Sequence, residues 1–135
     1  MSLNTRINPA TMAPPIGAYS QGVAASGAGT WLHVSGQVGI RPDGSLAEGI
    51  EEQADAAWRN VIAVLEAADM TIAHLVKITT LLVEVEHVAP AGRVRAKYLG
   101  DARPASTVAI VKSLVKPEFL FEVEAVAFRP LPSAP

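Results

Sequence analysis

The chain has 135 residues and a formal net charge of −2 at pH 7, with 50% of its residues hydrophobic and 18% charged. The charge balance argues against the basic surface of a nucleic-acid binder, and the absence of cysteine excludes disulfides, thiolate nucleophiles and cysteine metal ligands. No run approaches the roughly 18 apolar residues of a membrane span, and the N-terminus lacks the apolar stretch of a signal peptide. We therefore expect a cytoplasmic protein that has no membrane segment.

The length predicts one domain over residues 1–135. Residues 1–16 are polar and proline-bearing and are predicted to form an extended arm, with residues 129–135 as a tail. Few charges on so small a domain leave apolar surface in contact with water, and association of subunits is the simplest way to cover it.

The first half of the domain predicts strands followed by a helix. Small and β-branched residues predict strands over 18–26 and 30–40, with a glycine-bearing turn at 27–29 between them. The segment RPDGS (41–45) predicts a tight turn, because proline presets φ while aspartate and glycine tolerate the reversal. Apolar residues then recur at three- and four-residue spacing over 50–69, which predicts the clearest helix of the chain.

The second half predicts a strand over 75–85, a shorter helix over 87–98 and two final strands over 106–115 and 119–128. The resulting order, β-β-α-β-α-β-β, is typical of an α+β domain in which two helices cover one face of a mixed sheet.

Two carboxylates on the last predicted strand are candidates for chemistry. Glu122 and Glu124 point to the same face, because alternate residues of a strand share a side. They form either a half-solvated strand face or a cleft in which a carboxylate acts on a proton or a water. Ser35 and Gly36 also allow two interpretations. The small residues either let a ligand approach the backbone closely or form a β-bulge. The histidines show no ligand spacing and are interpreted as structural or surface residues.

Six segments occur in an order that is typical of one family: APPIGAYSQGV (13–23), VSGQVG (34–39), EEQADAAWRNVIAVLEAA (51–68), VKITTLLV (76–83), RPAST (103–107) and FEVEAVA (121–127). Together they resemble the RidA/YjgF family, also named the L-PSP endoribonuclease or translation-inhibitor family. The resemblance implies a chorismate-mutase-like α+β fold and a homotrimer with ligand clefts between neighbouring subunits. It also implies hydrolysis of reactive enamines and imines, such as 2-aminoacrylate, without metal or cofactor.

The resemblance assigns site roles residue by residue. Tyr19 matches the family tyrosine that lines the cleft, and Ser35 and Gly36 match the lining positions near its backbone. Glu124 matches the glutamate that positions the attacking water. The ligand that these positions imply is a small carboxylic or imino acid.

The chain departs from the deaminating members at the residue that clamps the substrate carboxylate. Those members carry an arginine after a Pro-Ala pair, and Ser106 stands there in this sequence. Arg103 is a poor substitute because residues three apart on an extended chain face opposite sides, and it is interpreted as a loop or interface residue. Arg95, on the second predicted helix, is a hypothetical replacement for the clamp; the alternative is a solvated helix arginine.

Two functions stay open on the sequence. One is a cofactor-independent hydrolase or deaminase of imine- or enamine-like metabolites, in which Glu124 orients water and Ser106 argues against the archetypal 2-aminoacrylate activity. The other is a non-catalytic small-ligand binder or regulator that uses the same clefts. Ribonuclease activity is disfavoured, because the chain has no basic footprint and few aromatic residues to stack on bases.

Overall fold

The computed structural model describes residues 4–132, which are built around a four-stranded sheet. The strands lie in the order β3 (Gly29–Val38), β6 (Phe121–Pro130), β4 (Leu75–Leu82) and β5 (Ala105–Ile110). β6 runs antiparallel to β3 and β4, whereas β4 and β5 are parallel, so the sheet is mixed. A parallel pair needs a crossover, and α2 (Val88–Leu99) supplies it.

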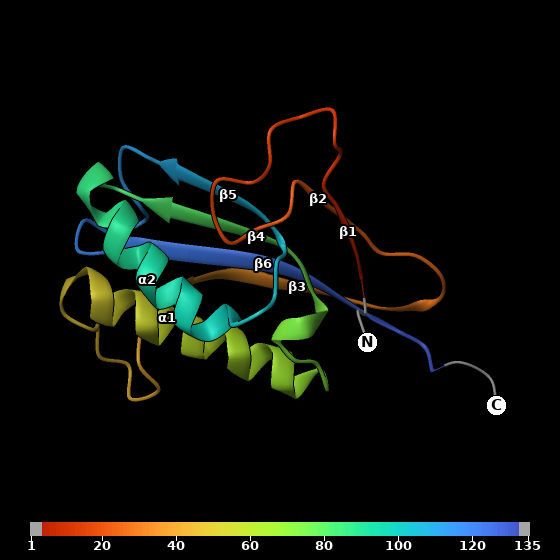
Figure 1. Ribbon diagram of the computed structural model, residues 1–135. Helices are drawn as coiled ribbons and strands as arrows, with labels where there is room; N and C mark the ends of the chain where they lie inside the picture. Colours follow the sequence, from red (N-terminus) through yellow and green to blue (C-terminus); the bar gives the residue numbers. More distant parts are fainter. Residues whose placement is uncertain (1–3, 133–135) are drawn as a thin grey trace.

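Both helices cover the same face of this sheet (Figure 1). α1 (Gly49–Ala67) connects β3 to β4, and short 3₁₀ turns, η1 (Ile72–His74) and η2 (Val85–His87), precede β4 and α2. The predicted α+β class is confirmed, and both helices begin and end within two residues of the predicted positions. No helix within residues 4–132 is long and apolar enough to cross a membrane.

Two predicted strands are wrong in length or partner. The strand predicted over 18–26 is reduced to β2 (Gly22–Ala24), which pairs with β1 (Thr5–Ile7) in a separate two-stranded ribbon. β1 lies within the predicted extended arm, and Ser20, just before β2, instead bridges the start of β5.

The strand predicted over 106–115 ends at Ile110. Val111 still donates to the Leu82 carbonyl at 2.8 Å, but β4 ends at Leu82, so the following residues have no strand beside them and form the loop 111–120. β6 continues to Pro130, and residues 133–135 of the predicted tail lie outside the described residues.

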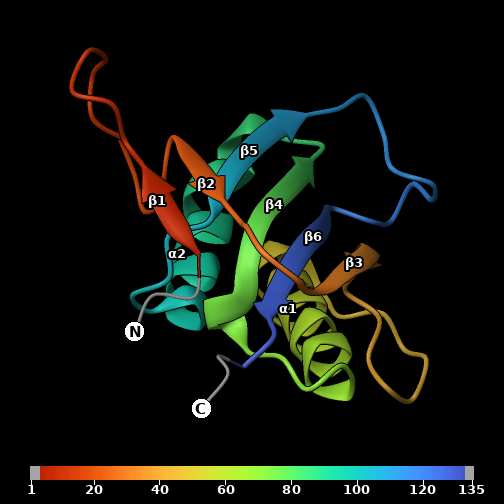
Figure 2. The ribbon, with the colours of Figure 1, turned by 90° about the vertical axis from the view of Figure 1, so that its right-hand side faces the viewer.

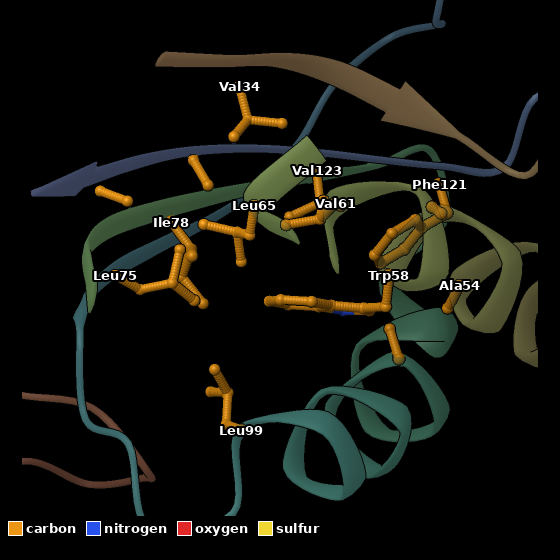
Figure 3. Packing of buried hydrophobic residues seen from close by; sticks show 14 of the residues in the cluster. Val34, Ala54, Trp58, Val61, Leu65, Leu75, Ile78, Leu99, Phe121 and Val123 are labelled. Carbon is orange, nitrogen blue, oxygen red and sulfur yellow. The ribbon is translucent and has the colours of Figure 1, made fainter. Parts of the chain in front are cut away.

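Trp58 lies at the centre of the core, between the helices and the sheet (Figure 3). Its side chain is fully buried, and its ring stacks on Tyr98 with the ring centroids 6.3 Å apart. The sheet contributes Ile78, Phe121 and Val123 from β4 and β6, all buried. Burying a large apolar side chain contributes about 1.5–3 kcal/mol, so the apolar stripe of α1 fixes this helix on the sheet.

The face of the sheet that turns away from the helices is called the outer face. It presents side chains from β3 and β6, namely Trp31, His33, Glu122, Glu124, Val126 and Phe128. Trp31 is 51% exposed, and its ring covers Phe128 at a centroid distance of 4.8 Å. The outer face thus combines exposed apolar surface with two carboxylates.

Gln53 joins α1 to the loop 111–120. Its buried side chain donates from Nε2 to the Glu118 carbonyl at 3.1 Å and accepts at Oε1 from the Leu120 N–H at 2.9 Å. Gly39 allows the close approach of α1, because a Cβ at that position would lie 2.6 Å from the Gln53 Cα. α1 is therefore tied to the residues that directly precede β6.

Candidate functional site

Arg95 and Ser106 form the helix-side group of predicted site residues. Ser106 is the register partner of the buried Ile78, so its side chain points toward the helices. Its Oγ is buried and has no hydrogen-bond partner among residues 4–132. A cavity of about 40 Å³ on the helix side of the sheet is lined by α1, α2, β4, β5 and β6 through residues that include Trp58, Thr80, Arg95 and Val108, but Ser106 does not line it.

The Arg95 guanidinium is partly buried and carries an unpaired charge. Burial lowers the pKa of Arg95, although an arginine stays protonated at neutral pH. Its Nε is buried without a hydrogen-bond partner, and it forms no ion pair within the described part of the chain. A desolvated guanidinium that lacks a partner is stabilised strongly by a carboxylate.

Tyr19 lies in the loop before β2, beside the start of the strand that carries Ser106. Ser20 fastens this loop, since its N–H donates to the Pro104 carbonyl at 3.2 Å and its Oγ to the Arg103 carbonyl at 2.5 Å. The Tyr19 hydroxyl accepts from the Ile16 N–H at 3.3 Å. Among residues 4–132 no group accepts the proton of this hydroxyl, which leaves it available for donation to a ligand.

Arg103 has a structural role in the turn between α2 and β5. Its Nη1 donates to the carbonyls of Gly100 and Ala102, both at 2.8 Å. These carbonyls follow the last turn of α2, where backbone acceptors lack helical partners. The finding agrees with the interpretation of Arg103 as a loop residue.

Glu124, Ser35 and Gly36 form the outer-face group. Glu124 is exposed and lies opposite Thr79 of β4. Ser35 and Gly36 lie where the register of β3 against β6 shifts. This irregularity corresponds to the bulge that was one of the two alternatives from the sequence. A Cβ at Gly36 would lie 1.8 Å from Glu122 Oε2, so the glycine leaves room for that carboxylate.

Lys77 also belongs to the outer face and was not among the site residues predicted from the sequence. Its Nζ donates to Thr107 Oγ1 at 2.8 Å and to Thr79 Oγ1 at 3.3 Å. Burial lowers the pKa of Lys77, and the negative charge of Glu124 partly opposes this. Strand periodicity places Lys77 and Thr79 on one face, but only the pairing of β4 with β6 places them beside Glu124.

The predicted site residues do not meet within one chain. Ser106 points to the helix side from β5, whereas Glu124 points to the outer side from β6, and β4 lies between these strands. The helix-side group holds the charge of Arg95, which has no ion-pair partner among residues 4–132, and the outer-face group holds the Glu124 carboxylate. Among residues 4–132, no three side chains of a metal-binding kind gather at one place.

Comparison with known proteins gives matches over most of the chain. The model of the family described as Endoribonuclease L-PSP matches residues 10–129. A RutC family protein of Pyrococcus horikoshii is 35% identical over 117 residues, which cover 85% of this chain and 90% of that protein. The human 2-iminobutanoate/2-iminopropanoate deaminase is 31% identical over 137 residues, covering 98% of this chain and 97% of the human protein.

Solved structures give the same result for the fold. The Yersinia pestis protein YyfB, described as a protein of unknown function of the conserved Rid family, superposes with a TM-score of 0.82 at 31% identity over 93% of this chain and 98% of that one. The E. coli protein TdcF, solved with bound serine, superposes with a TM-score of 0.71 at 26% identity over 93% of this chain and 99% of that one.

Proposed function

The chain belongs to the Endoribonuclease L-PSP family, also called the RidA/YjgF family, and from this premise we propose that it hydrolyses small imine- or enamine-like metabolites at clefts between its own subunits. The substrate class is supported by the deaminase relatives, which include the human protein. The location is supported by the division of the candidate residues, because Glu124 and Ser106 lie on opposite faces of the sheet. Association of subunits is a direct way to bring the two groups together.

In the proposed reaction Glu124 accepts a proton from a water whose oxygen attacks the imine carbon. Glu124 passes this proton to the imine nitrogen, which gives the carbinolamine. Transfer of the hydroxyl proton to the nitrogen then expels ammonia and leaves the keto acid, so one water is consumed for each ammonia released. Lys77 places a positive charge close enough to Glu124 for the two charges to interact, so both residues belong to the same part of the proposed cleft. The partly buried Arg95 contributes the positive charge that attracts the substrate carboxylate.

The test is ammonia release from 2-aminoacrylate generated in situ, with background hydrolysis subtracted. The wild-type protein is expected to accelerate release, and Glu124→Gln to lower the rate by about 100-fold, within the range of general-base contributions. Glu122→Gln is the matched control, because Glu122 shares the strand and face of Glu124. A wild-type rate equal to background, or an unchanged rate in Glu124→Gln, would contradict the proposed hydrolysis.

A non-catalytic small-ligand binder is the second candidate, and Ser106 is the observation that favours it. Without a bidentate arginine contact at that position, clamping of a carboxylate weakens by roughly ten- to 150-fold. For this candidate, titration with pyruvate should show binding that Arg95→Ala reduces about tenfold, while ammonia release stays at background. Arg93→Ala, on the same helix but paired with Glu51, should bind like the wild type. Unchanged affinity in Arg95→Ala removes Arg95 from both candidates.

A further inference from the structure

A groove of about 850 Å³ lies between the β1–β2 ribbon, η1 and the segment joining α2 to β5. It is called the ribbon groove here. Figure 2 shows the ribbon beside the start of β5, in agreement with the bridge between Ser20 and Ala105. None of the six predicted site residues lines the ribbon groove, so any ligand there would be separate from the proposed clefts.

Two guanidinium groups line the ribbon groove, and backbone carbonyls hold both. Arg6 Nη2 donates to the Asp101 carbonyl at 2.6 Å, and Arg103 Nη1 donates to the carbonyls of Gly100 and Ala102. Arg6 comes from β1 and Arg103 from the turn after α2, and both guanidinium groups bind carbonyls of the same segment, residues 100–102. Their positions are set by the backbone before any ligand binds.

These contacts leave most of the donor capacity of both arginines unused. A guanidinium carries five N–H donors, whereas Arg6 and Arg103 each engage a single nitrogen. Neither arginine forms an ion pair with a carboxylate of residues 4–132. Asp101 also lines the groove, so two positive charges face one negative charge, and the balance favours an anion.

The remaining wall of the ribbon groove is largely apolar. It is formed by side chains from β2, η1, β4, the end of α2 and the segment before β5, namely Val23, Ile72, Leu75, Leu99 and Pro104. Ligand sites commonly combine such an apolar lining with a few charged groups that fix orientation. A ligand that matches both parts has an apolar body and an anionic end.

We propose that the ribbon groove binds a small organic carboxylate with an apolar body, which Arg6 and Arg103 hold by its carboxylate. Bidentate guanidinium–carboxylate contacts are geometrically matched and charge-assisted, so two fixed arginines make a strong anchor. This site goes beyond the proposed hydrolysis, because it uses none of the residues assigned to that reaction.

The experiment is a titration of the full chain with phenylacetate, followed through backbone amide NMR shifts. Shifts are expected at groove residues, among them Thr5, Val23 and Ala73. Arg6→Gln should weaken phenylacetate binding at these residues by roughly tenfold or more, because one charge-assisted contact is lost. Arg6 is exposed, so this variant keeps the folded core, and Arg103→Gln provides a second, independent loss.

Two controls make the outcome decisive. Arg93→Gln removes an exposed arginine of α2 that does not line the groove, and it should bind phenylacetate like the wild type. Phenylacetamide, the neutral amide of the same shape, should bind at least roughly tenfold more weakly than phenylacetate. The site is overturned if the groove amides do not shift, if phenylacetamide binds equally well, or if Arg6→Gln binds like the wild type.

Discussion

Asp55 links α1 to α2 through hydrogen bonds from three side chains. Its carboxylate accepts from the Tyr98 hydroxyl, from Arg59 Nε at 2.9 Å and from Lys97 Nζ at 3.3 Å. Partial burial opposes ionisation, but these donors outweigh it and hold the pKa of Asp55 below its usual value. Tyr98 in turn stacks on Trp58, so a surface carboxylate is connected directly to the centre of the core.

Asp55→Asn should destabilise the protein by about 1–2 kcal/mol at pH 7, since charge-assisted bonds are lost at a partly solvated site. Because the folded-state pKa of Asp55 is lowered, its stabilisation is present above the unfolded value near 4. That stabilisation disappears as the pH falls through the folded pKa. Urea denaturation should therefore show a smaller difference between variant and wild type at pH 3 than at pH 7.

Glu66→Gln is the control for this comparison, because Glu66 is an exposed carboxylate of the same helix and forms no ion pair among residues 4–132. A difference for Asp55→Asn that stays constant from pH 7 to pH 3 would contradict the assigned role of the charge.

At the scale of elements, Gly36 in β3 and Gly39 directly after β3 differ in the kind of atom that lies beside them. Gly39 faces the backbone of α1, whereas Gly36 faces the end of the flexible Glu122 side chain. Backbone atoms of a packed helix cannot move without displacing the core, but a partly exposed carboxylate can rotate away.

Gly39→Ala should therefore cost about 1–3 kcal/mol of stability or more, as overpacking in a core does, and Gly36→Ala less than about 1 kcal/mol. Urea denaturation of both variants at equal protein concentration measures this, because association would make the midpoint depend on concentration. Equal losses for the two alanines would show that α1 does not pack as closely on Gly39 as described.

Periodicity is the reason why the helices and the long strands could be predicted. α1 and α2 have apolar residues at helical spacing and lie within two residues of expectation. The β1–β2 ribbon could not be predicted, because its three-residue strands are too short for a pattern and pair only through contacts between distant residues. The ribbon groove could not be predicted for the same reason, because Arg6 contacts the Asp101 carbonyl although the two residues are 95 positions apart in the sequence.

For the candidate site, the sequence predicted which residues are candidates but not how they are arranged in space. Glu124 and Glu122 were recognised as sharing one face, and the β6 register agrees with this. That Ser106 points to the other side of the sheet depends on the parallel pairing of β4 with β5, which local sequence does not encode. Lys77 was missed for the same reason, because its neighbours come from β5 and β6.

At the scale of the molecule, the outer face is the surface that we expect to be covered by other subunits. It carries the exposed Trp31 beside Phe128 and the half-buried Val126, and no helix of residues 4–132 covers it. Exposed apolar surface next to a polar group is typical of an interaction site. We therefore propose that this face is buried inside the homotrimer that the family resemblance implies.

Light scattering should give three times the 14.1 kDa mass of the chain. Trp31→Glu should lower this mass, because it places a charge on an apolar contact. Val85→Glu is the matched control, since Val85 is also exposed but lies in η2, away from the outer face. A monomer mass for the wild type, or an unchanged mass for Trp31→Glu, would contradict burial of the outer face.

The placement of Glu124 and Ser106 on opposite sides of one sheet has a genetic consequence under the proposed arrangement. Each cleft takes its carboxylate from one subunit and its arginine side from another, so a defect in either group leaves the other intact. Chains carrying Glu124→Gln and chains carrying Arg95→Ala, each impaired alone, would complement one another when they assemble into mixed trimers. The unit that carries activity would then be the interface between two subunits and not the single polypeptide.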